Sequence, residues 1–164
     1  MVKLNIEIDA GLLDAQIDRL QGWVKDGSLA LEAANRIANI AGRSFARRES
    51  PDGIAWEPLL PETVAAKQKA GYPDPSRPLY GSGHMQRSLT IESAGDTATV
   101  GLNAVAGVKE YPYPASHQFG APKRNIPARP FLPIDARGEL YEGVRLQIEA
   151  DLRGMIRTWL NSPL

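Results

Sequence analysis

The chain has 164 residues and balances 19 Lys and Arg against 19 Asp and Glu, so its formal net charge at neutral pH is zero. This length fits one domain, and the balanced charge argues against a dedicated nucleic-acid binder, which usually carries a basic excess. The absence of cysteine excludes disulfides, cysteine-ligated metal centres and thiol catalysis. Neither a membrane-spanning run of apolar residues nor a signal-peptide pattern is present. We therefore expect a single domain over residues 1–164, of cytoplasmic origin and without a membrane partner.

Proline divides the chain into three parts. Twelve of the thirteen prolines lie between Pro51 and Pro133, and residues 1–50 contain none. Because proline removes a backbone donor and fixes φ, a helix does not run through such a region. The composition predicts helices at both ends of the chain and a middle that is rich in loops and strands.

The N-terminal part predicts one strand and two helices. Residues 2–8 alternate between apolar and polar side chains, with Val, Leu and Ile at the even positions, which is typical of a half-buried strand. Apolar residues then recur with helical spacing from Leu13 to Val24 and again from Leu31 to Phe45. Ser28 stands where it can cap the second of these helices.

The proline-bounded middle predicts short elements joined by loops. Alternating side chains at 88–92 and 97–102 flank a four-residue loop at 93–96, which indicates a β-hairpin. Elsewhere we expect a turn at 51–53, a short helix over 62–69, one helical turn within 79–86, an edge strand or extended loop over 111–120, and exposed loops at 71–78 and 121–125.

The C-terminal part predicts a long amphipathic helix from Asp135 onward. Apolar residues repeat every four positions from Leu140 to Leu160. Glycines within this segment weaken it by roughly 1 kcal/mol each, so its stability should come from packing. The expected fold class is therefore α+β, with a mostly antiparallel sheet packed against N-terminal helices and a long C-terminal helix.

Groups suited to catalysis are few. The candidates are His84, His117, Ser82, Ser116, Asp96 and Asp135. A serine, a histidine and a carboxylate can form a nucleophilic triad, but Tyr80 stands where the hydrolase elbow needs a glycine two residues before Ser82. Neither metal-ligand spacing nor a complete nucleotide loop is present. We expect no catalytic residue, cofactor or metal; a Ser/His hydrolase stays as the alternative.

Basic side chains gather locally despite the neutral total. The candidate contacts with DNA or an acidic partner are Arg47, Arg48, Lys123 and Arg124. One interpretation is a solvated surface that acidic residues balance elsewhere in the chain. The other is contact with DNA phosphates or an acidic protein surface. In a ring, one basic loop per subunit would repeat into a charged collar whatever the net charge of the monomer.

Aromatic side chains occur mainly in the proline-bounded segments. They either pin irregular loops to the core or anchor a subunit interface, where Tyr, Trp and Arg are enriched. The candidate subunit or partner contacts are Trp56, Tyr111, Tyr113, His117, Gln118, Phe119, Arg129 and Phe131.

Four motifs follow one another over residues 45–132. They are Phe45 with the turn PDGIAWEPL at 51–59 and Thr63 and Lys67 behind it, LYGSGHMQRSL at 79–89, HQFG at 117–120, and IPARPFL at 126–132. In this order they resemble the Mu-like phage virion morphogenesis proteins, a family that includes tail completion proteins.

The resemblance implies a non-enzymatic virion protein that acts in tail completion or head–tail joining, assembled in the host cytoplasm. Related neck and tail-terminator proteins have small α+β domains and form rings, often hexameric, around the DNA channel. The implied partners are further copies of the chain, other neck, tail-tube or head-connector proteins, and DNA in the channel through non-specific contacts. A head (capsid) assembly factor of the same family is the alternative.

Overall fold

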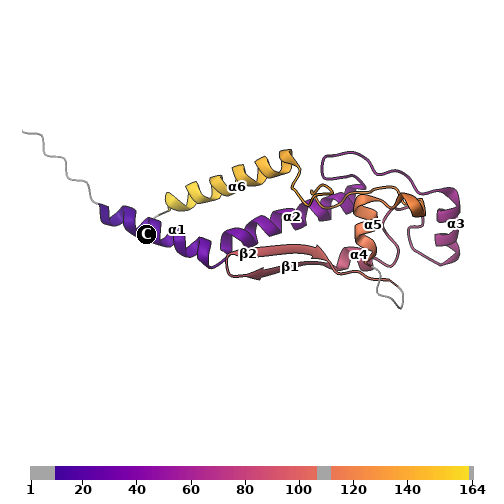
Figure 1. The fold of residues 1–164 in the computed structure, drawn as a ribbon, viewed down its shortest axis with the longest axis horizontal. Coiled ribbons are helices and arrows are strands. Elements are labelled where there is room, and N and C mark those ends of the chain that lie inside the picture. Colours follow the sequence, from indigo (N-terminus) through magenta and orange to yellow (C-terminus); the bar gives the residue numbers. More distant parts are fainter. Residues whose placement is uncertain (1–9, 107–111, 163–164) are drawn as a thin grey trace, which may run out of the picture.

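A computed structural model describes residues 10–106 and 112–162 of the chain. Its elements are α1 (Ala10–Lys25), α2 (Ser28–Arg47), α3 (Pro61–Lys69), α4 (His84–Arg87), β1 (Leu89–Ala94), β2 (Thr97–Leu102), α5 (Tyr113–Phe119), the 3-10 turn η1 (Pro122–Arg124) and α6 (Glu142–Leu160). Figure 1 shows an elongated molecule, with the long helices and the hairpin toward one end and the short helices and loops at the other. The α+β prediction is confirmed. The strand expected over residues 2–8 lies outside the described residues.

Helix α2 begins at a tight junction with α1. Gly27 has a left-handed backbone, with φ at 80°. Gly27 is the N-cap residue and Ser28 the first residue of the helix, so the cap expected from Ser28 is wrong. The Asp26 carboxylate accepts a hydrogen bond from the Ser28 amide at 2.9 Å. A Cβ atom added at Gly27 would collide with the carbonyl oxygen of Gly95. The tip of the hairpin is thereby packed directly against the start of α2.

Strands β1 and β2 form an antiparallel hairpin beside α2. Ala94 pairs with Thr97, so the connection has two residues and not the four that alternation predicted. Gly95 has a φ of 57°, a left-handed conformation that suits a tight hairpin turn. Ala98 and Val100 are half-buried, whereas Thr97 and Thr99 are exposed, so one face of β2 is turned to the interior.

The end of α6 is fastened to α1 by aromatic packing. The rings of Trp23 and Trp159 stack with centroids 5.4 Å apart. The Arg19 guanidinium lies 4.5 Å from the centroid of the Trp159 ring, a cation–π contact. Gln16 donates a hydrogen bond to the carbonyl oxygen of Leu160 at 3.2 Å. These contacts fix the direction in which α1 leaves the rest of the molecule.

The C-terminal helix begins later than the periodicity predicted. It starts at Glu142, and the preceding residues from Asp135 form a turn. The Asp135 carboxylate accepts hydrogen bonds from the backbone amides of Arg137 and Glu139, at 2.8 and 3.0 Å. Gly138 adopts a φ of 82°. Side-chain capture of the backbone and a left-handed glycine both oppose a helix at this point.

A further correction is α5, a helix where an edge strand or extended loop was expected. Pro114 stands in its first turn, where a missing N–H is harmless and the fixed φ suits a helix. The expected loop at 121–125 contains η1, and Ala121 pairs with Ile126 as an isolated bridge. Proline density therefore marks the starts of short helices as well as loops.

The buried core lies at the end of α2, where the loops gather. Phe45 stacks on Phe131 with ring centroids 5.0 Å apart and meets Trp56 edge to face at 5.9 Å. Met85 and Ala104 complete this cluster. Over residues 10–106 and 112–162, no helix combines the length and apolarity that crossing a bilayer requires.

The Gly27 junction gives a matched pair of stability measurements. Gly27→Ala should lower the free energy of unfolding by about 2 kcal/mol or more, because the added methyl group meets Gly95 in a left-handed backbone. Gly42→Ala, within α2 and with nothing near its added Cβ, should raise it by about 0.5–1 kcal/mol. Urea denaturation of both variants checks this. Equal effects would contradict the packed junction.

Candidate functional site

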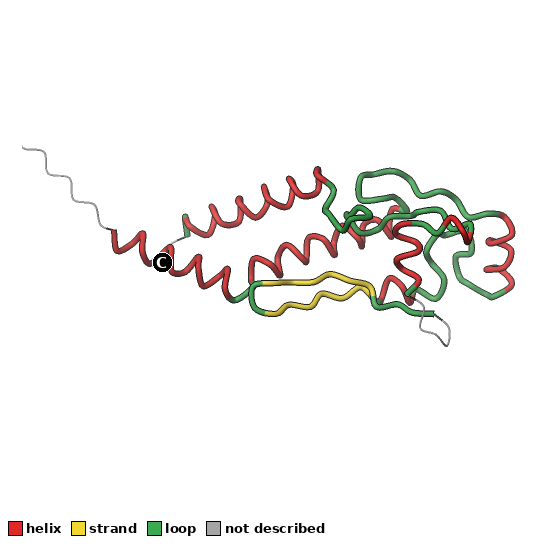
Figure 2. The backbone as a smooth tube through the Cα atoms, in the orientation of Figure 1, coloured by secondary structure: helices red, strands yellow, loops and turns green. Residues whose placement is uncertain are grey.

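The candidate site is the set of loops and short helices at the end of α2, which we call the loop platform and define as residues 48–88 and 112–134. Figure 2 shows these segments, mostly loop, side by side at the end of the molecule away from α1. All four motifs lie in the loop platform or, as with Phe45, directly against it.

Gln118 holds two of the motifs together. Its side chain is only 3% exposed. Its Oε1 atom accepts hydrogen bonds from the amides of Phe131 and Leu132, both at 3.0 Å. Its Nε2 atom donates to the carbonyl oxygens of Leu132 and Ile134 at 2.9 and 3.2 Å. Both lone pairs and both protons of the amide are therefore used on the backbone of one segment.

Arg129 joins that segment to the first motif. Its side chain is 5% exposed, and it donates from Nε to the Glu57 carbonyl at 2.9 Å and from Nη2 to the Pro58 carbonyl at 3.2 Å. Burial lowers the pKa of the guanidinium, and the charge of Glu57 opposes that shift. The Trp56 indole donates to the Pro130 carbonyl at 2.8 Å. Each bond ties one proline-bounded loop to another.

Four of the eight predicted contact residues are thus internal. Trp56, Gln118, Arg129 and Phe131 are buried, and they pin the loops to the core. Their contact with a neighbouring subunit stays a prediction. Tyr111 lies outside the described residues.

The other three contact candidates lie together on α5. Tyr113 and His117 are half-buried, and Phe119 is 45% exposed. The rings of Tyr113 and His117 meet edge to face, with centroids 6.1 Å apart. Helix α5 therefore presents aromatic surface outward while Gln118, on the same helix, binds the interior.

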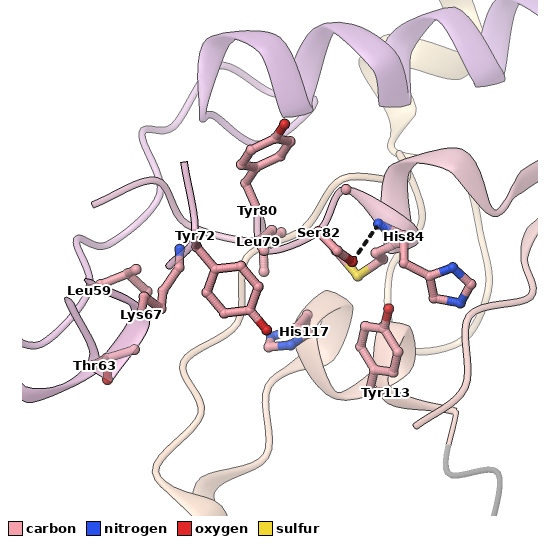
Figure 3. A pocket seen from close by; sticks show the side chains of 13 residues that line it. Leu59, Thr63, Lys67, Tyr72, Leu79, Tyr80, Ser82, His84, Tyr113 and His117 are labelled. Atoms are coloured by element: carbon pink, nitrogen blue, oxygen red, sulfur yellow. Dashed lines mark hydrogen bonds between the residues drawn. The ribbon is translucent and has the colours of Figure 1, made fainter. Parts of the chain in front are cut away.

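Two open cavities flank His117. The first, of about 320 Å³, lies between α5 and the second motif. In Figure 3, Tyr72, Tyr80, Tyr113 and His84 surround it together with His117. The second, of about 720 Å³, also has His117 in its lining and lies between the first motif and η1. Its apolar lining comes from Leu59, Leu60, Phe119, Pro122, Ile126 and Pro127. The loop platform therefore carries grooves as well as a rigid interior.

His117 itself is placed for a structural role. Within the described residues, its Nδ1 atom is buried without a hydrogen-bond partner. Burial lowers its pKa below the usual value of 6.5, and the charge of Arg129 lowers it further. The Ser82 hydroxyl meets the backbone amide of His84 at 3.4 Å, rather than an imidazole. In the part of the chain that the structure describes, no three His, Asp or Glu side chains are grouped to hold a metal.

The four basic candidates occupy two separate elements. Arg47 and Arg48 end α2, whereas Lys123 and Arg124 lie on η1, and all four are exposed. Arg47 pairs with Glu49 at 3.4 Å and Arg48 with Asp74 at 3.3 Å. Such exposed pairs contribute little to stability. The structure leaves all four side chains accessible to a partner.

A further set of residues fixes the loop at 71–78, which sequence reasoning expected to be exposed. Lys67 donates to the Arg77 carbonyl at 2.6 Å. Arg77 in turn donates to the Phe45 carbonyl at 3.0 Å and lies over the Tyr80 ring. The loop is irregular, as predicted, but it is tied to α2 and α3. The sequence marked Lys67 as a motif residue without indicating this role.

The Gln118 clamp predicts a large loss of stability on its removal. Gln118→Met keeps the size of the side chain but leaves two buried amides without an acceptor, which should cost about 2–4 kcal/mol. The matched control, Gln68→Met on the exposed surface of α3, should stay within about 0.5 kcal/mol of the wild type. Denaturant unfolding measures both. A Gln118→Met protein as stable as its control would refute the clamp.

His117 predicts a pH dependence of stability. Its folded pKa lies below 6.5, so below that pH the unfolded chain takes up a proton that the folded chain does not. The contribution of His117 to the free energy of unfolding is therefore fully present above the unfolded pKa. It declines as the pH falls through 6.5 toward the lowered pKa of the folded state. His117→Gln should flatten the slope of unfolding free energy against pH in this window. An unchanged slope in His117→Gln would exclude this assignment.

Comparison with known proteins agrees with the motifs. Residues 13–161 of the 164 match the model of the phage virion morphogenesis family. No curated protein and no solved structure gives a significant match. The family match extends from α1 through the loop platform to the end of α6, and it confirms the resemblance carried by the four motifs. The chain belongs to the phage virion morphogenesis family.

Proposed function

We propose that the chain is a non-enzymatic structural subunit that acts in tail completion and head–tail joining of a phage or prophage. It assembles as a ring, a hexamer in our proposal, at the neck or the head-proximal end of the tail. The observation that carries this proposal is the loop platform, in which the family's motifs serve to build a stiff, grooved surface at one end of an elongated domain.

Stiffness suits a surface that must meet a partner. Prolines restrict the loops before binding, and the Gln118 and Arg129 hydrogen bonds hold them in one arrangement. A surface that is ordered in advance loses less conformational entropy when it binds. The loop platform therefore has the properties expected of a docking surface for neck, tail-tube or head-connector proteins.

The second cavity of the loop platform, of about 720 Å³, supplies apolar contact area, and we call it the outer groove. Leu60 and Phe119 line it and are 56% and 45% exposed. Exposed aromatic and aliphatic groups in a groove are typical of interface centres. Lys123 and Arg124 follow Pro122 on η1, and of these three residues Pro122 lines the groove. In a ring the two basic side chains repeat as a basic collar that faces DNA or an acidic partner.

A structural role also accounts for the histidines. His117 contributes an aromatic contact to Tyr113 and is kept uncharged by burial, and Ser82 is engaged by a backbone amide. These arrangements support packing rather than acid–base chemistry. We propose that the subunit belongs to the virion after assembly in the host cytoplasm, which the family match supports. A head assembly factor of the same family is the second candidate.

A phage that lacks this chain tests the proposal directly. Electron microscopy of the lysate should show complete heads and tails that are not joined, because the joining ring is missing. Supply of the wild-type chain in trans should restore infectious particles. Supply of Phe119→Asp, which places a charge in the outer groove, should restore far fewer than the matched Phe119→Leu.

The two candidate functions give different images. A head assembly factor predicts aberrant or missing heads alongside normal tails. Normal infectious particles in the absence of the chain would refute both candidates.

A further inference from the structure

An apolar groove lies beside the outer edge of β2. It encloses about 390 Å³ between α2, β2 and the last residues of the loop platform. The side chains that give it an apolar lining include Ala30, Ile37, Ala98, Val100, Leu132 and Ile134. Of the hairpin, β2 and the residue before it line this groove, and no residue of β1 does.

The edge of β2 is open next to this groove. Over the described residues the sheet consists of β1 and β2, and no third strand pairs with β2. Ala94 and Thr97 close the two-residue turn as a hydrogen-bonded pair. Because hydrogen-bonded and non-hydrogen-bonded pairs alternate along an antiparallel hairpin, Ala98 and Val100 belong to non-hydrogen-bonded pairs. Their backbone amides and carbonyls therefore point away from β1. An unpaired edge of this kind is a template for another strand.

The sequence supplies a strand that fits both features. Residues 2–8 place Val2, Leu4, Ile6 and Ile8 on one face and Lys3, Asn5 and Glu7 on the other. Neighbouring strands share the orientation of their faces, so a strand added to β2 would turn its apolar face the same way as Ala98 and Val100, into the groove. Its polar face would then lie beside the exposed Thr97 and Thr99.

The geometry of α1 rules out pairing within one chain. Figure 1 shows α1 leaving the hairpin tip in the direction away from the strands, and the Trp23–Trp159 stack holds it there. The 16 residues of α1 put its first residue, Ala10, about 24 Å from the tip. A nine-residue segment reaches at most about 32 Å when fully extended. Folded back, it would run along α1, and only its first residues would pass the tip.

We propose that residues 2–8 of one copy add as a third strand to the outer edge of β2 in a neighbouring copy, with their apolar side chains in the groove. The inference rests on the proposed ring and names the contact that builds it. Each subunit then carries a donor strand at the free end of α1 and an acceptor edge beside α2. Such a head-to-tail contact generates a closed ring when the rotation between subunits closes.

Disulfide trapping tests the contact, since the natural chain has no cysteine to interfere. Two differently tagged chains are co-expressed with the null phage, one with Ile6→Cys and the other with Ala98→Cys, Val100→Cys or Leu102→Cys. The three acceptor positions cover the neighbouring registers of the added strand. After oxidation of the purified particles, non-reducing gels should show a band that contains both tags and disappears on reduction.

The matched control places the acceptor cysteine on the other face of β2. Ile6→Cys with Thr99→Cys should give little of the two-tag band, because the side chains point to opposite faces of the sheet. A chain that carries both Ile6→Cys and Val100→Cys provides the intramolecular test, and a disulfide within that one chain, seen as a faster-migrating monomer on a non-reducing gel, would overturn the exchange between copies. Absence of a two-tag band at all three acceptor positions, in particles that contain both chains, would overturn it as well.

A second comparison separates this contact from the proposed function. Ile6→Asp puts a charge on the apolar face of the donor segment and should shift the assembled species to the mass of the monomer in light scattering. Asn5→Asp, a similar charge on the polar face, should leave the assembled mass unchanged. Rings and joined particles that form normally with Ile6→Asp would refute strand exchange and leave the proposed function standing. Joined particles that form without the chain at all would refute the proposed function itself.

Discussion

The amide of Gln118 is the interaction on which the loop platform depends. Irregular backbone cannot pair its own N–H and C=O groups in a ladder, yet buried groups of this kind need partners. Gln118 supplies four such bonds to residues 131–134, and Arg129 supplies two more to the first motif. Side chains here replace the secondary structure that proline prevents, and they position the aromatic core of Phe45 and Phe131 against α2.

The periodicity of apolar residues correctly predicted the helices and strands that bury one face and expose the other. The stripe from Leu31 to Phe45 and the alternation at 97–102 gave α2 and β2 because each packs one face inward. It failed where local chemistry overrides the pattern. Pro114 lies in the first turn of α5, where it does not break a helix, and the Asp135 side chain captures backbone amides that the apolar repeat assigned to α6.

The residues singled out as partner contacts stay a prediction in that role, and the internal roles of four of them came from the structure. The sequence pattern singled out Trp56, Gln118 and Arg129 as partner contacts, and it left an inward-facing role open only for the aromatic Trp56. The structure places them inside, bonded to carbonyl and amide groups of distant loops. Those partners are backbone groups, which recur along the whole chain. No complementary side chain in the sequence could therefore have indicated them.

The close approach of Gly27 to Gly95 has a geometric consequence for assembly. It sets the angle between α1 and the hairpin, and in the proposed exchange one end of that angle holds the donor strand and the other the acceptor edge. In the proposed ring, the rotation from one subunit to the next would then depend on this glycine junction. The diameter of that ring would be set in part by a backbone contact too close to admit a methyl group.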